Sequence, residues 1–387
     1  MKKQSFAWRV LLSLLLACFC FSLPIVAQEE AKILDGSALP GEYHAWLESI
    51  PKEIAELLPT GIFSESREEM GEAVNEISSF SYLCSTLLEL IGARLGGCAK
   101  ILASSFGLLL LSAVFQALRG AFKSEGVQKA FGLCSTLVIT LALICQSYDC
   151  LVRVTDYFAN LNTMTAALLP VNTVLYAMGG NTSTAVASSA GLSVYMTVME
   201  EIVGKTILPF CGICMALALM GTLDSSLRTS GLLSATKKNY TTVLSFLMML
   251  LLAMLSAQST LGTRADSLAM RSVKFAAGSW IPVVGGSVAE LLRTIGAGVG
   301  YLRGAVGICG IFLLLFLLLP TLVELFLLRL CWQLSSAGAD LLGCEREKKL
   351  LEEFASILGY LIAAVSICSS VLLLSLILLA TCASAIA

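Results

Sequence analysis

Charged side chains are too few in this sequence to cover the surface of a water-soluble globular protein. Of its 387 residues, 13% are charged and 57% are hydrophobic, whereas soluble domains carry roughly 25% charged residues. From residue 100 onward the chain is a series of apolar stretches, several close to the ~20 residues that a membrane-spanning helix needs. We therefore predict an all-α, polytopic membrane protein with six to eight transmembrane helices, some of which can be re-entrant or broken.

Six apolar stretches carry this prediction. For residues 305–328, seventeen Leu, Ile, Val or Phe side chains at roughly -0.4 kcal/mol each outweigh the cost of Glu324, about +3 kcal/mol, so this stretch is expected to insert. Two further regions, 164–199 and 278–303, fit either two short crossings or a re-entrant pair, which leaves the number of crossings open. The six clearest stretches are residues 101–118, 130–146, 207–222, 241–261, 305–328 and 354–380.

The N-terminal quarter has a different composition. Residues 1–27 have a basic start, an apolar middle and a small-residue end, which predicts a signal peptide, with an uncleaved anchor helix as the alternative. Residues 28–99 form an acidic segment, with twelve acidic and three basic side chains between residues 28 and 80. Its apolar residues recur at helical spacing, so we expect extracytoplasmic amphipathic helices that either lie on the bilayer or dock a partner. Residues 100–387 are then the membrane domain.

Loop charges predict the orientation of that domain. Basic residues gather in the loops at 119–129, 228–238 and 346–349, which favours a cytoplasmic location for all three. The basic residues at 264–274 fit this scheme badly, because they should lie outside if residues 241–261 make a simple crossing. An interfacial or re-entrant stretch there would remove the conflict.

Glycines recur on one helical face between residues 296 and 307. Without side chains at these positions, two helix backbones can approach closely, and in lipid such stripes stabilise helix packing. The packing can be within the chain or between subunits. The predicted helix-packing glycine stripe comprises Gly296, Gly300, Gly304 and Gly307, and Gly310 continues it.

A second glycine-rich stretch surrounds a proline. Non-helical backbone at membrane depth is tolerated only where protein buries it or where it lines a wet cavity. The stretch is therefore predicted to be either a structural hinge or part of a solute path. This broken-helix motif comprises Gly278, Trp280, Pro282, Gly285 and Gly286.

The sequence offers no catalytic, cofactor-binding or metal site. The single histidine, His44, excludes a histidine-based metal centre or triad. Gly204-Lys205-Thr206 lacks the earlier glycine of a phosphate-binding loop, because Met199 stands there. Charged groups in the C-terminal half are few, and we expect most to lie near helix ends, which argues against an autonomous transporter. They are Glu290, Arg293, Arg303, Glu324, Arg329 and Asp340.

Several stretches resemble stage III sporulation protein AE of endospore-forming bacteria. The most specific is RSVKFAAGSWIPVVG at residues 271–285, followed by GAVGICG at 304–310. Weaker agreement is found in FQALRGAF at 115–122 and in MTAALLPVNTVLYA at 164–177. The resemblance covers about residue 95 to the C-terminus, whereas the N-terminal part is similar only in layout.

This resemblance implies a non-catalytic role in the multi-protein channel that connects mother cell and forespore during endospore formation, as a platform or conduit. It implies a multi-pass location in the mother-cell membrane around the forespore. The implied partners are other stage III sporulation A-operon proteins, including a separate ATPase, and indirectly stage II sporulation protein Q. Independently of the resemblance, the net charge of -2 argues against a nucleic-acid partner, and the glycine stripe allows a homo-oligomer. The alternative function is a stand-alone permease for a small solute.

Overall fold

The computed structural model describes most of the chain after residue 79 and only scattered positions before it. Every regular element in the described part is helical, and five helices are long and apolar enough to cross a membrane. This confirms the predicted all-α membrane fold; the count of six to eight crossings stays a prediction. The described residues are 80–119, 125–199, 205–223, 229–246, 248–253 and 285–381, with isolated positions between 46 and 79 and at 201 and 256.

Two long helices begin the described bundle. Helix α5 covers Phe80–Arg119 and helix α6 covers Glu125–Met178. At ~1.5 Å per residue, the 54 residues of α6 extend about 80 Å, well beyond a hydrocarbon core of ~30 Å. The predicted stretch at 130–146 is therefore only the first part of α6.

A tight turn reverses the chain after α6. Gly180 adopts a φ of +75°, which glycine reaches without the steric cost of a Cβ atom, and helix α7 then covers Thr182–Val198. Whether the region at 164–199 makes two short crossings or a re-entrant pair stays a prediction. Its first half is the C-terminal end of the long α6, and its second half is a separate helix that packs back against it.

Helix α8, Lys205–Leu223, and the helical residues 229–246 and 248–253, together called the 229–253 segment, form the next pair. The Phe210 and Tyr240 rings stack between them, with centroids 3.9 Å apart. Lys237 and Lys238 lie inside the second of these helices and not in a loop as expected. Lys237 is 5% exposed and pairs with Glu353.

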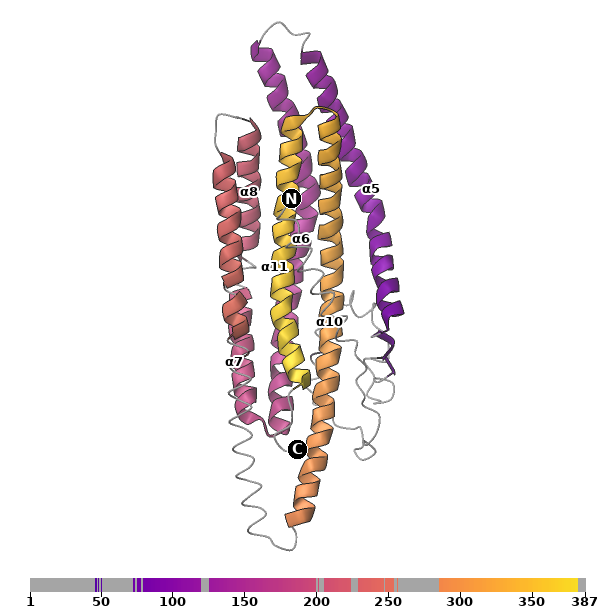
Figure 1. Ribbon diagram of the computed structural model, residues 1–387, viewed down its shortest axis with the longest axis vertical. Helices are drawn as coiled ribbons and strands as arrows, with labels where there is room; N and C mark the ends of the chain where they lie inside the picture. The colour runs from indigo at the N-terminus through magenta and orange to yellow at the C-terminus, as the bar shows by residue number, and fades with distance from the viewer. Residues whose placement is uncertain are drawn as a thin grey trace.

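Helices α10 and α11 form a hairpin through the middle of the bundle. Helix α10 covers Gly285–Leu341 and helix α11 covers Glu345–Thr381. In the turn between them Gly343 has a φ of +71°, and the Cys344 amide donates to the Ala339 carbonyl at 2.8 Å. Figure 1 shows the hairpin flanked by α5 on one side and by α7 and α8 on the other, with α6 behind it.

The hairpin carries about half of the buried apolar side chains among the described residues. Phe316 and Leu325 of α10, and Phe354 and Val365 of α11, are fully buried or nearly so. Large exposed apolar residues gather elsewhere, mostly on α5, on the first half of α6, on α8 and on the 229–253 segment. A surface of this kind is unsuited to water, so these outer helices are the part of the described bundle best suited to lipid.

Basic segments of the chain lie towards one end of the bundle. In Figure 1 the C-terminal end of α5, the start of α6, the C-terminal end of α8 and the α10–α11 turn all lie towards the upper end. The loop charges predicted that these helix ends share one side of the membrane. Their common end agrees with that grouping, and we refer to it below as the basic end.

The predicted signal peptide, most of residues 28–79 and the basic positions at 264–274 lie outside the described residues, whereas residues 80–99 of the predicted acidic segment form the first half of α5. Within the acidic segment Trp46 and Ile77 are buried, each at 0% exposed. Three prolines lie inside described helices: Pro170 in α6, Pro209 in α8 and Pro320 in α10.

Candidate functional site

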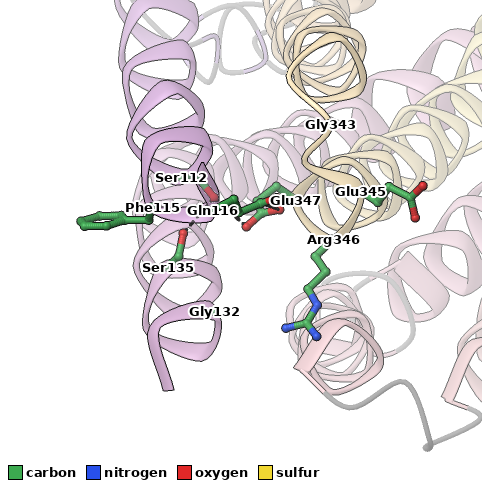
Figure 2. Close-up of a pocket in the computed structure, with 9 residues that line it drawn as sticks. All are labelled: Ser112, Phe115, Gln116, Gly132, Ser135, Gly343, Glu345, Arg346 and Glu347. Carbon is green, nitrogen blue, oxygen red and sulfur yellow. Dashed lines mark hydrogen bonds between the residues drawn. The ribbon is translucent and has the colours of Figure 1, made fainter. Parts of the chain in front are cut away.

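A polar pocket opens at the basic end, where α5, α6 and the α10–α11 turn meet. Its volume is about 210 Å³. Figure 2 shows the side chains of α5 and α6 on one side of it and the first turn of α11 on the other. The lining residues are Ser112, Phe115, Gln116, Gly132, Ser135, Gly343, Glu345, Arg346 and Glu347.

The Glu347 carboxylate organises the pocket. Ser112 Oγ donates to Glu347 Oε1 at 2.8 Å, and Gln116 Nε2 donates to Glu347 Oε2 at 3.4 Å. Ser135 Oγ of α6 donates in turn to Ser112 Oγ at 2.9 Å. Three helices are therefore joined by one chain of hydrogen bonds that ends on a carboxylate that is only 2% exposed.

Local sequence explains why Glu347 reaches this position. It lies in the first turn of α11, where the helix dipole favours a negative charge. Its neighbours Glu345 and Arg346 point away from Ser112 and Gln116 in Figure 2, because adjacent helical positions lie ~100° apart around the axis. Only Glu347 is therefore directed towards α5.

Sequence patterns alone did not predict this pocket. Phe115 and Gln116 stood out only as part of a stretch that resembles the sporulation family. Glu347 is, in the sequence, one charge among several in a basic loop. A detectable signal was present, since Ser112 and Ser135 interrupt the apolar stretches of two consecutive helices.

A second polar cluster joins the interiors of three helices. Arg153 of α6 pairs with Glu324 of α10, and Arg94 Nη1 of α5 lies 3.7 Å from Glu324 Oε2. The Glu324 side chain is 14% exposed, and the two arginine side chains are 42% and 46% exposed. The cluster explains how an apolar helix tolerates this carboxylate, because a charge inside a membrane protein is stabilised by a partner.

The expectation that most of the scattered charges lie near helix ends was wrong. Helix α10 extends from Gly285 to Leu341, so five of the six lie inside it and only Asp340 lies at its end. The helix is longer than the apolar stretch that predicted it, since contacts with α11, α5 and α6 support it over many turns.

The glycine stripe divides into two parts along α10. A Cβ atom on Gly307 would lie 2.7 Å from Ala380 Cβ, and one on Gly310 would lie 2.7 Å from Leu376 Cδ2, so these two glycines pack against α11. Gly300 and Gly304 have no atom of the described residues within 4 Å of such a Cβ. Gly296 lies in α10, but the structure does not describe its surroundings. The stripe thus combines an intramolecular crossing with an open stretch.

The broken-helix motif lies mostly outside the described residues. Gly278, Trp280 and Pro282 are not described, whereas Gly285 and Gly286 are the first two residues of α10. Whether the motif lines a path or acts as a hinge stays a prediction.

Buried cysteines in the described helices behave as small apolar residues. Cys211 and Cys214 of α8 are both 0% exposed and unpaired by disulfides. The described part of the chain holds no group of three or more His, Cys, Asp or Glu residues placed to bind a metal ion. The predicted absence of catalytic and cofactor sites stays a prediction.

Comparison with known proteins decides the family. The family described as stage III sporulation protein AE matches residues 66–384 of the chain. The chain belongs to the stage III sporulation protein AE family. A curated relative of that name, from Bacillus subtilis (strain 168), is 22% identical over 284 residues, which are 73% of this chain and 71% of the relative. No solved structure matches the chain.

Family membership confirms the resemblance seen in the sequence and gives the chain a role in sporulation. It also places the chain in the stage III sporulation A-operon group. The matched region begins at residue 66 and so includes all of the described helices. Together with the apolar helices, this makes the protein a multi-pass membrane protein of sporulation.

Proposed function

We propose that this protein is a membrane component of the multi-protein channel that connects mother cell and forespore, and that it acts as a platform or conduit without catalysis. The observation that carries the proposal is the family match over residues 66–384, which coincides with a bundle of helices suited to a membrane. In this proposal the protein lies in the mother-cell membrane around the forespore.

The geometry favours a platform. Helices α6 and α10 extend about 80–85 Å at ~1.5 Å per residue, so a bilayer of ~30 Å covers less than half of each. The remaining length offers surface to partners outside the lipid. The proposed partners are other A-operon proteins, including a separate ATPase, with stage II sporulation protein Q contacted indirectly.

Deletion of the gene tests the channel role. We expect arrested spore development after engulfment with normal vegetative growth, and restoration by the intact gene. Co-purification from sporulating cells should recover other A-operon proteins with the tagged chain. Normal spores from the deletion strain would refute the proposal.

A stand-alone permease is the second candidate, and the Arg94–Arg153–Glu324 cluster is the observation that favours it. Carboxylates and arginines inside spanning segments are the groups that coupled transporters use. Vesicles that contain only this protein distinguish the two functions. Solute flux that disappears in Glu324→Gln would support the permease, and an absence of flux across a panel of ions and small metabolites would support the platform.

A further inference from the structure

The buried carboxylate of Glu347 has unused capacity to accept hydrogen bonds. An ionised carboxylate has about four acceptor sites, and Ser112 and Gln116 occupy two of them. Among the described residues, no ion pair within 4.0 Å joins it to a lysine or arginine. The partial positive charge of ~0.5 at the start of α11 balances part of the negative charge. A cationic ligand would balance the rest.

The surroundings of Glu347 admit such a ligand. The pocket of about 210 Å³ presents hydroxyl, amide and carboxylate groups, with Phe115 at its edge. Arg346 is exposed at the rim, and Figure 2 shows its side chain directed away from Glu347. The charge that faces the interior of the pocket is therefore negative, whereas a positive charge is available outside it.

An apolar groove adjoins the polar pocket. It measures about 220 Å³, lies between α5 and α6, and shares Ser112, Phe115 and Ser135 with the polar pocket. The rest of its lining is apolar or weakly polar: Leu108, Leu111, Cys134, Val138 and Ile139. Leu111 is 48% exposed and Val138 is 53% exposed, so the groove is open on the outer side of the bundle.

Along the bundle, the polar pocket is followed by the apolar groove, which matches the polar head group and apolar acyl chain of a lipid. The polar pocket lies at the basic end. It is near the C-terminal end of the candidate span Cys84–Leu118 and near the starts of the spans Gly132–Met178 and Glu345–Ala380. The groove lies deeper within the first two spans. A head group at Glu347 would thus have its acyl chain beside Leu111 and Val138.

We propose that this composite site binds an aminophospholipid from the leaflet at the basic end of the bundle. Its primary ammonium donates hydrogen bonds to Glu347, its phosphate lies near Arg346 at the rim, and one acyl chain occupies the groove. A primary ammonium has three N–H donors, whereas the trimethylammonium of a choline lipid has none. The site therefore discriminates between these two head groups.

Native mass spectrometry of the delipidated full chain in detergent tests this proposal. Phosphatidylethanolamine and phosphatidylcholine with identical acyl chains are added in turn, and the bound fraction is measured. The wild-type chain should prefer the ethanolamine lipid by about tenfold, the ratio that one charge-assisted contact of ~1.4 kcal/mol gives. Glu347→Gln should remove this preference, and Val138→Trp should reduce binding of both lipids by filling the groove.

Glu352→Gln is the matched control, because Glu352 is an exposed carboxylate on the same helix outside the pocket. It should bind both lipids as the wild-type chain does. Circular dichroism and gel filtration verify that each variant is folded. If Glu347→Gln does not fold, Val138→Trp still tests whether the groove holds an acyl chain. Equal binding of the two lipids by the wild-type chain, or an unchanged preference in Glu347→Gln, would overturn the proposal.

Discussion

At the scale of single residues, polar side chains inside apolar helices determine which helices meet. Ser112, Ser135 and Glu347 come from three helices, and the carboxylate is stable in a buried position because hydroxyl and amide donors surround it. Leaving a buried acceptor without a donor costs about 1–3 kcal/mol, and more for a charged group. The same groups thus fix the position of the α10–α11 turn against α5 and α6.

Cys344 is a chemical probe of the contact between the α10–α11 turn and Glu347. It lies in the turn, is 0% exposed, and has a pKa raised above the ordinary thiol value, first by burial and then by the negative charge of Glu347. Because the thiolate is the reactive form, Cys344 needs a higher pH than an ordinary thiol to reach the same labelling rate. We expect Cys344 to label slowly with maleimide at pH 8.

In Glu347→Gln the second cause is absent, so the pKa of Cys344 should fall and its labelling should become faster. Peptide-resolved mass spectrometry measures the rate at each cysteine. The exposed Cys84 serves as the internal control and should label equally in both proteins. Identical Cys344 rates at every pH between 7 and 9 would contradict the assigned influence of Glu347.

Removing one member of the ionic cluster should destabilise the bundle. Arg153→Leu leaves Glu324 with only the longer contact to Arg94. We expect a loss of about 1–2 kcal/mol, less than the 3–5 kcal/mol of a fully buried pair because Arg153 is half exposed. Thermal unfolding in detergent measures it. Arg153→Leu combined with Glu324→Leu should recover stability. A double variant that is less stable than Arg153→Leu alone would contradict this.

At the scale of elements, the α10–α11 hairpin depends on close contact at glycine. Gly307 lies against the backbone of Ala380, whereas no described residue lies within 4 Å of a Cβ atom on Gly300, two turns earlier. Gly307→Leu should therefore separate the two helices and cost about 1–3 kcal/mol, as overpacking does elsewhere. Thermal unfolding of the detergent-solubilised protein measures the difference.

Gly300→Leu is the matched variant on the same helix, since it introduces the same side chain without an intramolecular clash. Its unfolding temperature should equal that of the wild-type chain. If the open part of the stripe packs against another subunit, Gly300→Leu should instead reduce recovery of assembled complex from sporulating cells. Equal destabilisation by the two variants would contradict the division of the stripe.

At the scale of the whole molecule, the shared basic end predicts the orientation. Cysteines placed singly at positions 121 and 227 in a cysteine-free chain should both react with a membrane-impermeant reagent only from the cytoplasmic side, because basic segments remain there. A cysteine at Gly180, in the turn at the opposite end of α6, should not react from that side. Labelling of positions 121 and 227 from opposite sides would refute a common end.

The sequence by itself determined the class of fold and the family. Low charge and repeated apolar stretches close to ~20 residues indicate a helical membrane protein, because backbone groups must be paired in lipid and stretches of this length fit spanning helices. The stretches at 271–285 and 304–310 indicate the family through their order of residues alone. These properties depend on local composition and order, and the sequence contains both directly.

The tertiary structure alone decided which distant residues meet. Ser112 and Glu347 are 235 positions apart, and Arg153 and Glu324 are joined across two helices. Helical periodicity gives the face on which each lies but not the helix that faces it, because many pairings bury equal apolar area. The lengths of α6 and α10 were likewise set by packing against neighbours. The polar pocket at Glu347 therefore exists only in the assembled bundle.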